Sequence, residues 1–222
     1  MIVRKRRPRP AELGLSAAEG RTLCALRTPW QIQEFVGSLH ANFEDKGDTL
    51  RSVRGALRHH AGHCIEAAFV AACALWLNGD PPLLMDLQAT EDDADHVIAV
   101  FRRGGCWGAI SKSNHVWLRW RDPIYRNPRE LAMSYFHEYT NGARKTLRAY
   151  SDPIDLRRFA VEDWVSSEED CWEVGGALDD FPHHRLITPA QARTLRPREA
   201  IEIKANELLQ FEHHDRKRAH RY

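Results

Sequence analysis

The sequence lacks several features that would assign it to a special class of protein. Its 32 Lys and Arg nearly cancel its 31 Asp and Glu, so no whole-molecule charge favours nucleic acid or another polyanion as partner. The longest apolar run, 67–77, is too short to cross a bilayer, and no apolar signal-peptide core follows the basic N-terminus. We therefore expect a cytoplasmic protein that binds neither membrane nor nucleic acid.

Metal-binding and redox motifs are absent as well. The five cysteines are odd in number and widely spaced, and no two of them form a C-x-x-C motif. Adjacent histidines occur at 59–60, 183–184 and 213–214, but neighbouring residues on a helix point about 100° apart, and no Cys or carboxylate stands at ligand spacing. We expect reduced thiols, no metal and no cofactor.

The chain has the length and composition of one ordinary domain. Its 222 residues include 43% apolar and 28% charged side chains, close to globular averages, so a single core can form without disulfides. Residues 1–12 are rich in arginine and too poor in apolar residues to order themselves, which predicts a flexible basic tail. Residues 196–222 are predicted to form a charged C-terminal helix, so the domain spans 13–195.

One segment has the character of a fully buried helix. Residues 64–77 read CIEAAFVAACALWL, with Glu66 as the only charge, so the segment is apolar on every side at a length that helices favour. Asn78 and Gly79 supply a fitting C-terminal signal, with two prolines just beyond. The other predicted elements are strands at 83–87, 96–102, 106–111, 116–121 and 172–174, and helices at 28–39 and 128–139.

Cys64 opens this helix and is the candidate nucleophile. The unpaired N–H groups and the positive dipole end of a helix N-terminus favour thiolate over thiol and can also stabilise an oxyanion. His96, at the start of a strand that faces the helix, is the candidate general base. His63 either adds positive charge beside the thiol or is simply an exposed side chain. A Cys-His pair of this kind suits nucleophilic catalysis, but by itself it equally fits a buried cysteine that packs as a small apolar side chain.

The predicted hairpin supplies a third residue. A turn centred between Arg103 and Gly104 would place Ser111 directly opposite His96, with both side chains on one face of the sheet. Serine accepts a hydrogen bond from imidazole but supplies no negative charge. Asn114 is the alternative third residue if the strand ends in a bend, and Asp122 is a more distant one.

The stretches GHCIEAAFVAACALWLNGDPPLLMDL, DHVIAVF and CWGAIS resemble the core of the transglutaminase-like superfamily over roughly residues 50–125. The run from WGAISKSNH to ELAMSYFHEY is similar to bacterial members. The resemblance implies an α+β fold of the papain-like type, with a Cys-bearing helix packed on an antiparallel sheet. It implies that Cys64 is the nucleophile and His96 the base, and it aligns Ser111 with the position that is generally Asp.

We therefore expect a hydrolase or acyltransferase that acts on a peptide or small amide through an acyl-enzyme. Trp107, four residues before Ser111, is the aromatic residue expected near the substrate, together with His63. The alternative is a binding or scaffolding domain that keeps the fold with impaired catalysis, because Ser111 replaces the expected acid.

Overall fold

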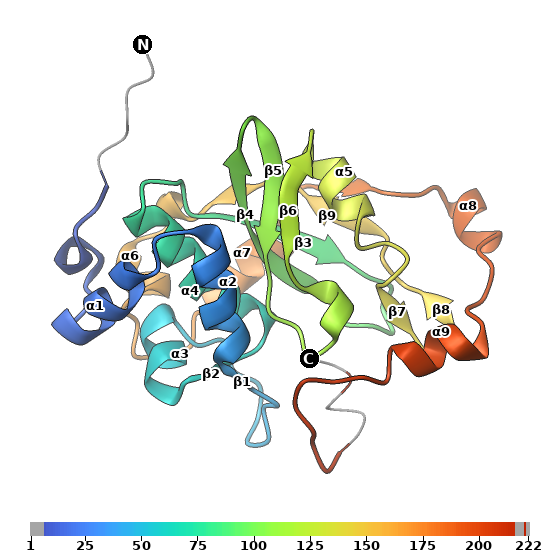
Figure 1. Cartoon of the computed structure of the whole chain (residues 1–222), viewed down its shortest axis with the longest axis horizontal. Helices are drawn as coiled ribbons and strands as arrows, with labels where there is room; N and C mark the ends of the chain where they lie inside the picture. Colours follow the sequence, from blue (N-terminus) through green and yellow to red (C-terminus); the bar gives the residue numbers. More distant parts are fainter. Residues whose placement is uncertain (1–6, 216–219, 221–222) are drawn as a thin grey trace.

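The computed structural model describes residues 7–215 and residue 220. These residues form a seven-stranded antiparallel sheet in the order β11-β9-β3-β4-β5-β6, with β10 beside β3, and the helices within residues 17–77 gather on one side of it (Figure 1). The predicted α+β class is confirmed. Within the described ranges, no helix has the length and apolar character needed to cross a bilayer.

The strands of the sheet are β3 (Leu83–Gln88), β4 (His96–Arg103), β5 (Cys106–Ile110), β6 (Arg121–Tyr125), β9 (Ala149–Ser151), β10 (Ile154–Asp155) and β11 (His183–Arg185). The α-helices in the described part are α1 (Ala17–Ala25), α2 (Pro29–Ser38), α3 (Val53–His59), α4 (Cys64–Leu77), α5 (Pro128–Met133), α6 (Val161–Trp164), α7 (Trp172–Asp179), α8 (Pro189–Arg193) and α9 (Ala200–Ala205). Two small strand pairs, β1 (His40–Ala41) with β2 (Ala61–Gly62) and β7 (Thr140–Asn141) with β8 (Arg144–Lys145), and the 3-10 turns η1 (Pro10–Leu13), η2 (Val116–Leu118) and η3 (Leu156–Arg158) complete the elements.

The central helix α4 has the predicted bounds at both ends. It packs between β4 and the helices α1, α2 and α3, and most of its side chains are fully buried. It ends because Gly79 adopts a positive φ of 96°, which lets the next N–H bond back to the Leu75 carbonyl. Five of its fourteen residues are buried alanines, whose small side chains let the helix lie close to its neighbours.

The strand β4 is covered by apolar side chains on both faces, as predicted. Val97, Ala99 and Phe101 join the core around α4, whereas Ile98 and Val100 join a second core on the opposite side of the sheet. Phe136, Tyr135 and Leu131, from α5 and the turn after it, fill that second core. The two cores hold β4 in place, and with it the residue at its start, His96.

The β4–β5 hairpin differs from the predicted register. Gly104 and Gly105 both have positive φ, as a two-residue turn of the mirror-image type requires, and Arg103 therefore pairs with Cys106. The predicted turn centre was one residue too early, so Ser111 is offset by two positions from the residue directly opposite His96. Side chains alternate with a period of two, so this error leaves Ser111 on the predicted face.

Several predicted elements are wrong. Residues 116–121 are not a strand: Val116–Leu118 forms a 3-10 turn, and β6 begins only at Arg121. The predicted strand at 172–174 is the start of α7, whose buried Val174 and Leu178 follow helical spacing. The helix at 128–139 ends at Met133 and continues as turns.

The two segments predicted to flank the domain differ from the structure in conformation. Residues 1–6 of the predicted tail lie outside the described residues, while Pro10–Leu13 forms a 3-10 turn beside α1 with Leu13 buried. The predicted C-terminal helix is limited to the six residues of α9 within the described part. Beyond α9 the chain is held instead by hydrogen bonds from Gln210 and Phe211 to Asn114.

Candidate active site

Cys64 is the first residue of α4 and lines a cleft. Burial raises the pKa of its thiol, but hydrogen bonds from His63 and His96, with the charges of both rings, outweigh burial and lower the pKa to about 5. Two buried thiols differ from Cys64 in this respect. Burial raises the pKa of Cys171 to about 12 and also raises the pKa of Cys73. Cys64 is therefore in its nucleophilic thiolate form at neutral pH.

His96 is oriented by Ser111. The His96 Nε2 lies 2.6 Å from the Ser111 Oγ, and the same hydroxyl donates to the Leu118 carbonyl at 2.8 Å. Because the serine proton is used on that carbonyl, the hydroxyl accepts from an Nε2–H of His96. This leaves Nδ1 as the ring nitrogen that serves Cys64. The predicted contact between His96 and Ser111 is present, and the catalytic role of both stays a prediction.

Ser111 is fixed in turn by a side chain of α2. The Gln33 Oε1 accepts from the Ser111 backbone N–H, and the Gln33 Nε2 donates to the Ser111 carbonyl, both at 2.9 Å. Ser111 follows the last residue of β5, so its backbone bonds to the Gln33 side chain instead of to a neighbouring strand. The His96 ring is thus held in place from the helical layer as well as from the sheet.

His63 caps α4 on the other side of the thiol. Its Nε2 lies 3.0 Å from the Thr49 carbonyl oxygen, 3.5 Å from the Glu66 Oε1 and 3.7 Å from the Glu44 Oε1. Burial lowers the pKa of His63, but its hydrogen bond with Cys64 and the charge of Glu66 outweigh burial and raise the pKa to about 9.

Glu66 is a completely buried carboxylate. It accepts hydrogen bonds from the backbone N–H groups of His63 and Arg51, from the Thr49 hydroxyl and from the Asn42 amide. A buried carboxylate needs this number of donors, because an unpaired charge costs several kcal/mol inside a protein. The same carboxylate closes the first turn of α4, next to the residue that carries the thiol.

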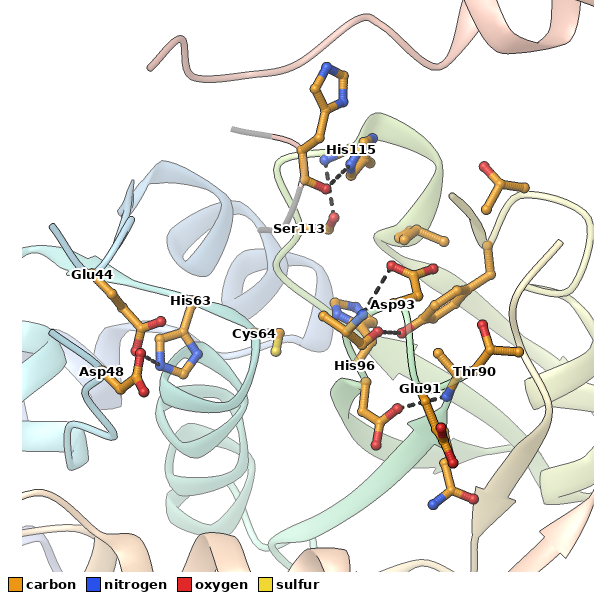
Figure 2. A pocket seen from close by; sticks show the side chains of 18 of the residues that line it. Glu44, Asp48, His63, Cys64, Thr90, Glu91, Asp93, His96, Ser113 and His115 are labelled. Carbon is orange, nitrogen blue, oxygen red and sulfur yellow. Dashed lines mark hydrogen bonds and ion pairs between the residues drawn. The ribbon is translucent and has the colours of Figure 1, made fainter. Parts of the chain in front are cut away.

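The cleft around these residues has a volume of about 540 Å³. Figure 2 shows the Cys64 side chain between the rings of His63 and His96, with Glu44 and Asp48 on the His63 side and Glu91 and Asp93 on the His96 side. The space is large enough for a peptide segment or a small amide. Ser111 is buried behind His96 and does not line the cleft.

Two predicted site residues lie elsewhere. Asn114 donates its amide to the Phe211 carbonyl and accepts from the Phe211 N–H, so it anchors the C-terminal segment, and a role for it in orienting His96 stays a prediction. Trp107 lies at the turn end of β5, where the Arg102 guanidinium stacks on its ring. The described cleft is lined instead by Tyr139, which is buried, and by Trp172, which is 51% exposed.

Few sequence signals point to the residues that support Cys64 and His96. Gln33 is a polar residue beside Ile32 on the buried face of α2. A polar side chain on a buried face needs a hydrogen-bond partner, and this need is the sequence signal that could have pointed to its contact with Ser111. Glu66 is similarly the single charge of an apolar helix. Glu44 and Thr49 come from an irregular segment, and nothing in the spacing connects them with His63.

No family model matches the sequence, and no curated protein is significantly similar to it. The chemistry of the cleft is therefore inferred from its own geometry.

Proposed function

We propose that this protein is a thiol enzyme with a papain-like core of the transglutaminase-like type, which cleaves or transfers an amide through an acyl-enzyme on Cys64. The observation that carries the proposal is the arrangement at the start of α4. A thiolate at a helix N-terminus faces an open cleft beside His96, and a buried Ser111 holds the other nitrogen of that ring. Five free thiols suit a reducing compartment such as the cytoplasm.

The proposed reaction has two steps. In the first, the Cys64 thiolate attacks the carbonyl carbon, and protonated His96 gives its proton to the departing amine, which leaves an acyl-enzyme and neutral His96. In the second, His96 takes a proton from water, the hydroxide adds to the acyl carbon, and Cys64 departs as thiolate. An amine in place of this water gives transfer instead of hydrolysis. Free N–H groups in the first turn of α4 are suited to stabilise the oxyanion.

An activated ester tests the proposal without knowledge of the natural substrate. After mixing with p-nitrophenyl acetate, mass spectrometry should find one acetyl group, on Cys64, and the group should be lost slowly to water. His96→Gln should retain the acetyl group about 100-fold longer, because general base catalysis contributes at least this factor. Cys106 and Cys24, which are also partly exposed, are the internal controls.

The alternative is a binding domain that has kept the fold without turnover, which the neutral Ser111 favours. It predicts that Cys64 reacts with p-nitrophenyl acetate no faster than Cys106. Labelling spread evenly over the accessible thiols would therefore reject the enzyme proposal.

A further inference from the structure

His63 and His96 contact the same thiol but differ in what lies behind them. The His96 ring nitrogen that points away from Cys64, Nε2, contacts the neutral hydroxyl of Ser111. The corresponding nitrogen of His63, also Nε2, faces the Thr49 carbonyl and the carboxylates of Glu66 and Glu44. The negative charge that usually supports a catalytic imidazole is thus placed behind His63 in this protein.

The surroundings of His63 define its protonation. Its Nε2 faces acceptor groups, so this nitrogen carries a hydrogen, and the remaining Nδ1 is the one that meets the Cys64 sulfur. A ring between a thiolate and two carboxylates is stabilised as the imidazolium. The side chain is only 8% exposed, so solvent screens these charges weakly.

We propose that His63 is the fixed charge partner of the Cys64 thiolate, held as an imidazolium by Glu66 and Glu44, and that His96 carries out the proton transfers. This inference rests on the proposed function of Cys64. It accounts for a serine at the third position, because the fixed positive charge that stabilises the thiolate is supported by Glu66 and does not require an acid beside His96.

The assignment leaves the reaction balanced. His63 keeps its proton throughout the cycle. The proton that leaves with the amine comes from His96, and His96 recovers it from the attacking water when the acyl-enzyme is hydrolysed. Cys64 is a thiolate both before the attack and after the release of the acid.

The thiolate absorbance at 240 nm, taken as the difference from Cys64→Ala, tests the charge pair directly. The midpoint of the wild-type titration should lie near pH 5. In His63→Gln it should rise by about 1–2 pH units, the shift expected when a neighbouring opposite charge is removed. Turnover of p-nitrophenyl acetate should then fall about tenfold near pH 5.5 and recover above about pH 8, because a thiol with this raised midpoint is almost fully ionised there.

His96→Gln is the matched control, because it should still lose about 100-fold in turnover above about pH 8, where the thiol is ionised in both variants and only proton transfer is missing. An unchanged thiolate midpoint in His63→Gln, or a turnover deficit that persists above about pH 8 as that of His96→Gln does, would overturn the inference. Glu44→Gln removes one carboxylate while keeping its shape, and it should raise the midpoint in the same direction by a smaller amount. If His63→Gln does not fold, the absence of any shift in Glu44→Gln overturns the inference instead.

The two proposals fail in different ways. A wild-type midpoint near pH 5 that rises in His63→Gln, without any acetyl-enzyme, would refute the proposed function and leave the charge pair established. An acetyl-enzyme on Cys64 with a midpoint that does not respond to His63→Gln would refute the charge pair and leave the proposed function standing.

Discussion

Replacement of Ser111 by alanine removes a single hydroxyl from behind the candidate catalytic histidine. That hydroxyl accepts from His96 at 2.6 Å and donates to the Leu118 carbonyl at 2.8 Å. The alanine keeps the Cβ and both backbone hydrogen bonds to Gln33, so the local fold should survive. The variant therefore tests the orientation of the ring without removing the ring.

The expected magnitudes follow from these two bonds. A buried group left without its partner costs about 1–3 kcal/mol. Both bonds are buried, so the two groups left without Ser111 should together cost about 2–6 kcal/mol of stability. One hydrogen bond of about 1.4 kcal/mol that holds the ring in its reactive orientation corresponds to a tenfold change in rate.

Two measurements check the reasoning. Urea unfolding followed by tryptophan fluorescence should show the loss of stability, and hydrolysis of the acetyl-enzyme should be about tenfold slower than in the wild type. Alkylation of Cys64 by iodoacetamide should change little, because the hydroxyl contacts His96 and not the sulfur. A normal rate of deacetylation would refute the orienting role of Ser111. A loss of alkylation equal to the loss of deacetylation would mean that Ser111 acts on the thiolate.

Four further outcomes are expected. Gln33→Ala should slow deacetylation as Ser111→Ala does, and the double variant should be little worse than either, because both changes act on one chain of contacts; additive losses would show independent roles. Since the pKa of Cys64 is lowered to about 5, its thiolate persists above that pH, and alkylation by iodoacetamide should stay fast from about pH 8 to about pH 6 and slow near pH 5; an ordinary thiol slows across that whole range. Glu66→Ala should lower the free energy of unfolding by about 3–5 kcal/mol, measured in urea, because it strands several buried donors. Phe69→Ala should cost about 3–5 kcal/mol in a calorimetric or urea experiment, because the ring is fully buried against Trp164; a cost below 1 kcal/mol would contradict the packing.

The parts of the fold that follow from local patterns were predictable from the sequence. The bounds of α4 follow from an apolar run that starts at Cys64 and stops at Asn78. The segment 96–102 has apolar residues on both faces and few charges, which is typical of an inner strand. The segment 116–121 misled because its alternation VWLRWR has the period of a strand, yet Leu118 packs into the core from a 3-10 turn. Tertiary contacts decided that case.

The candidate site was predictable where it depends on the order of elements and not where it depends on contacts between distant segments. The face shared by His96 and Ser111 survived an error in register because strand side chains alternate. Gln33 lies 78 residues before Ser111, and the partners of His63 come from a loop, so no local pattern reveals these contacts. Only the folded chain brings them together.

The geometry of the candidate site depends on the alanines of α4, although their side chains take no part in the proposed reaction. The thiol belongs to the helical layer and the His96 ring to the sheet, so the gap between sulfur and imidazole is set by how deeply the helix sinks onto β4. The buried alanines of α4, Ala71 and Ala72 among them, have small side chains that let the helix lie close to the elements packed around it. Replacement of one such alanine by a larger side chain would change the distance between the Cys64 sulfur and the His96 ring, although every polar residue of the site would stay the same.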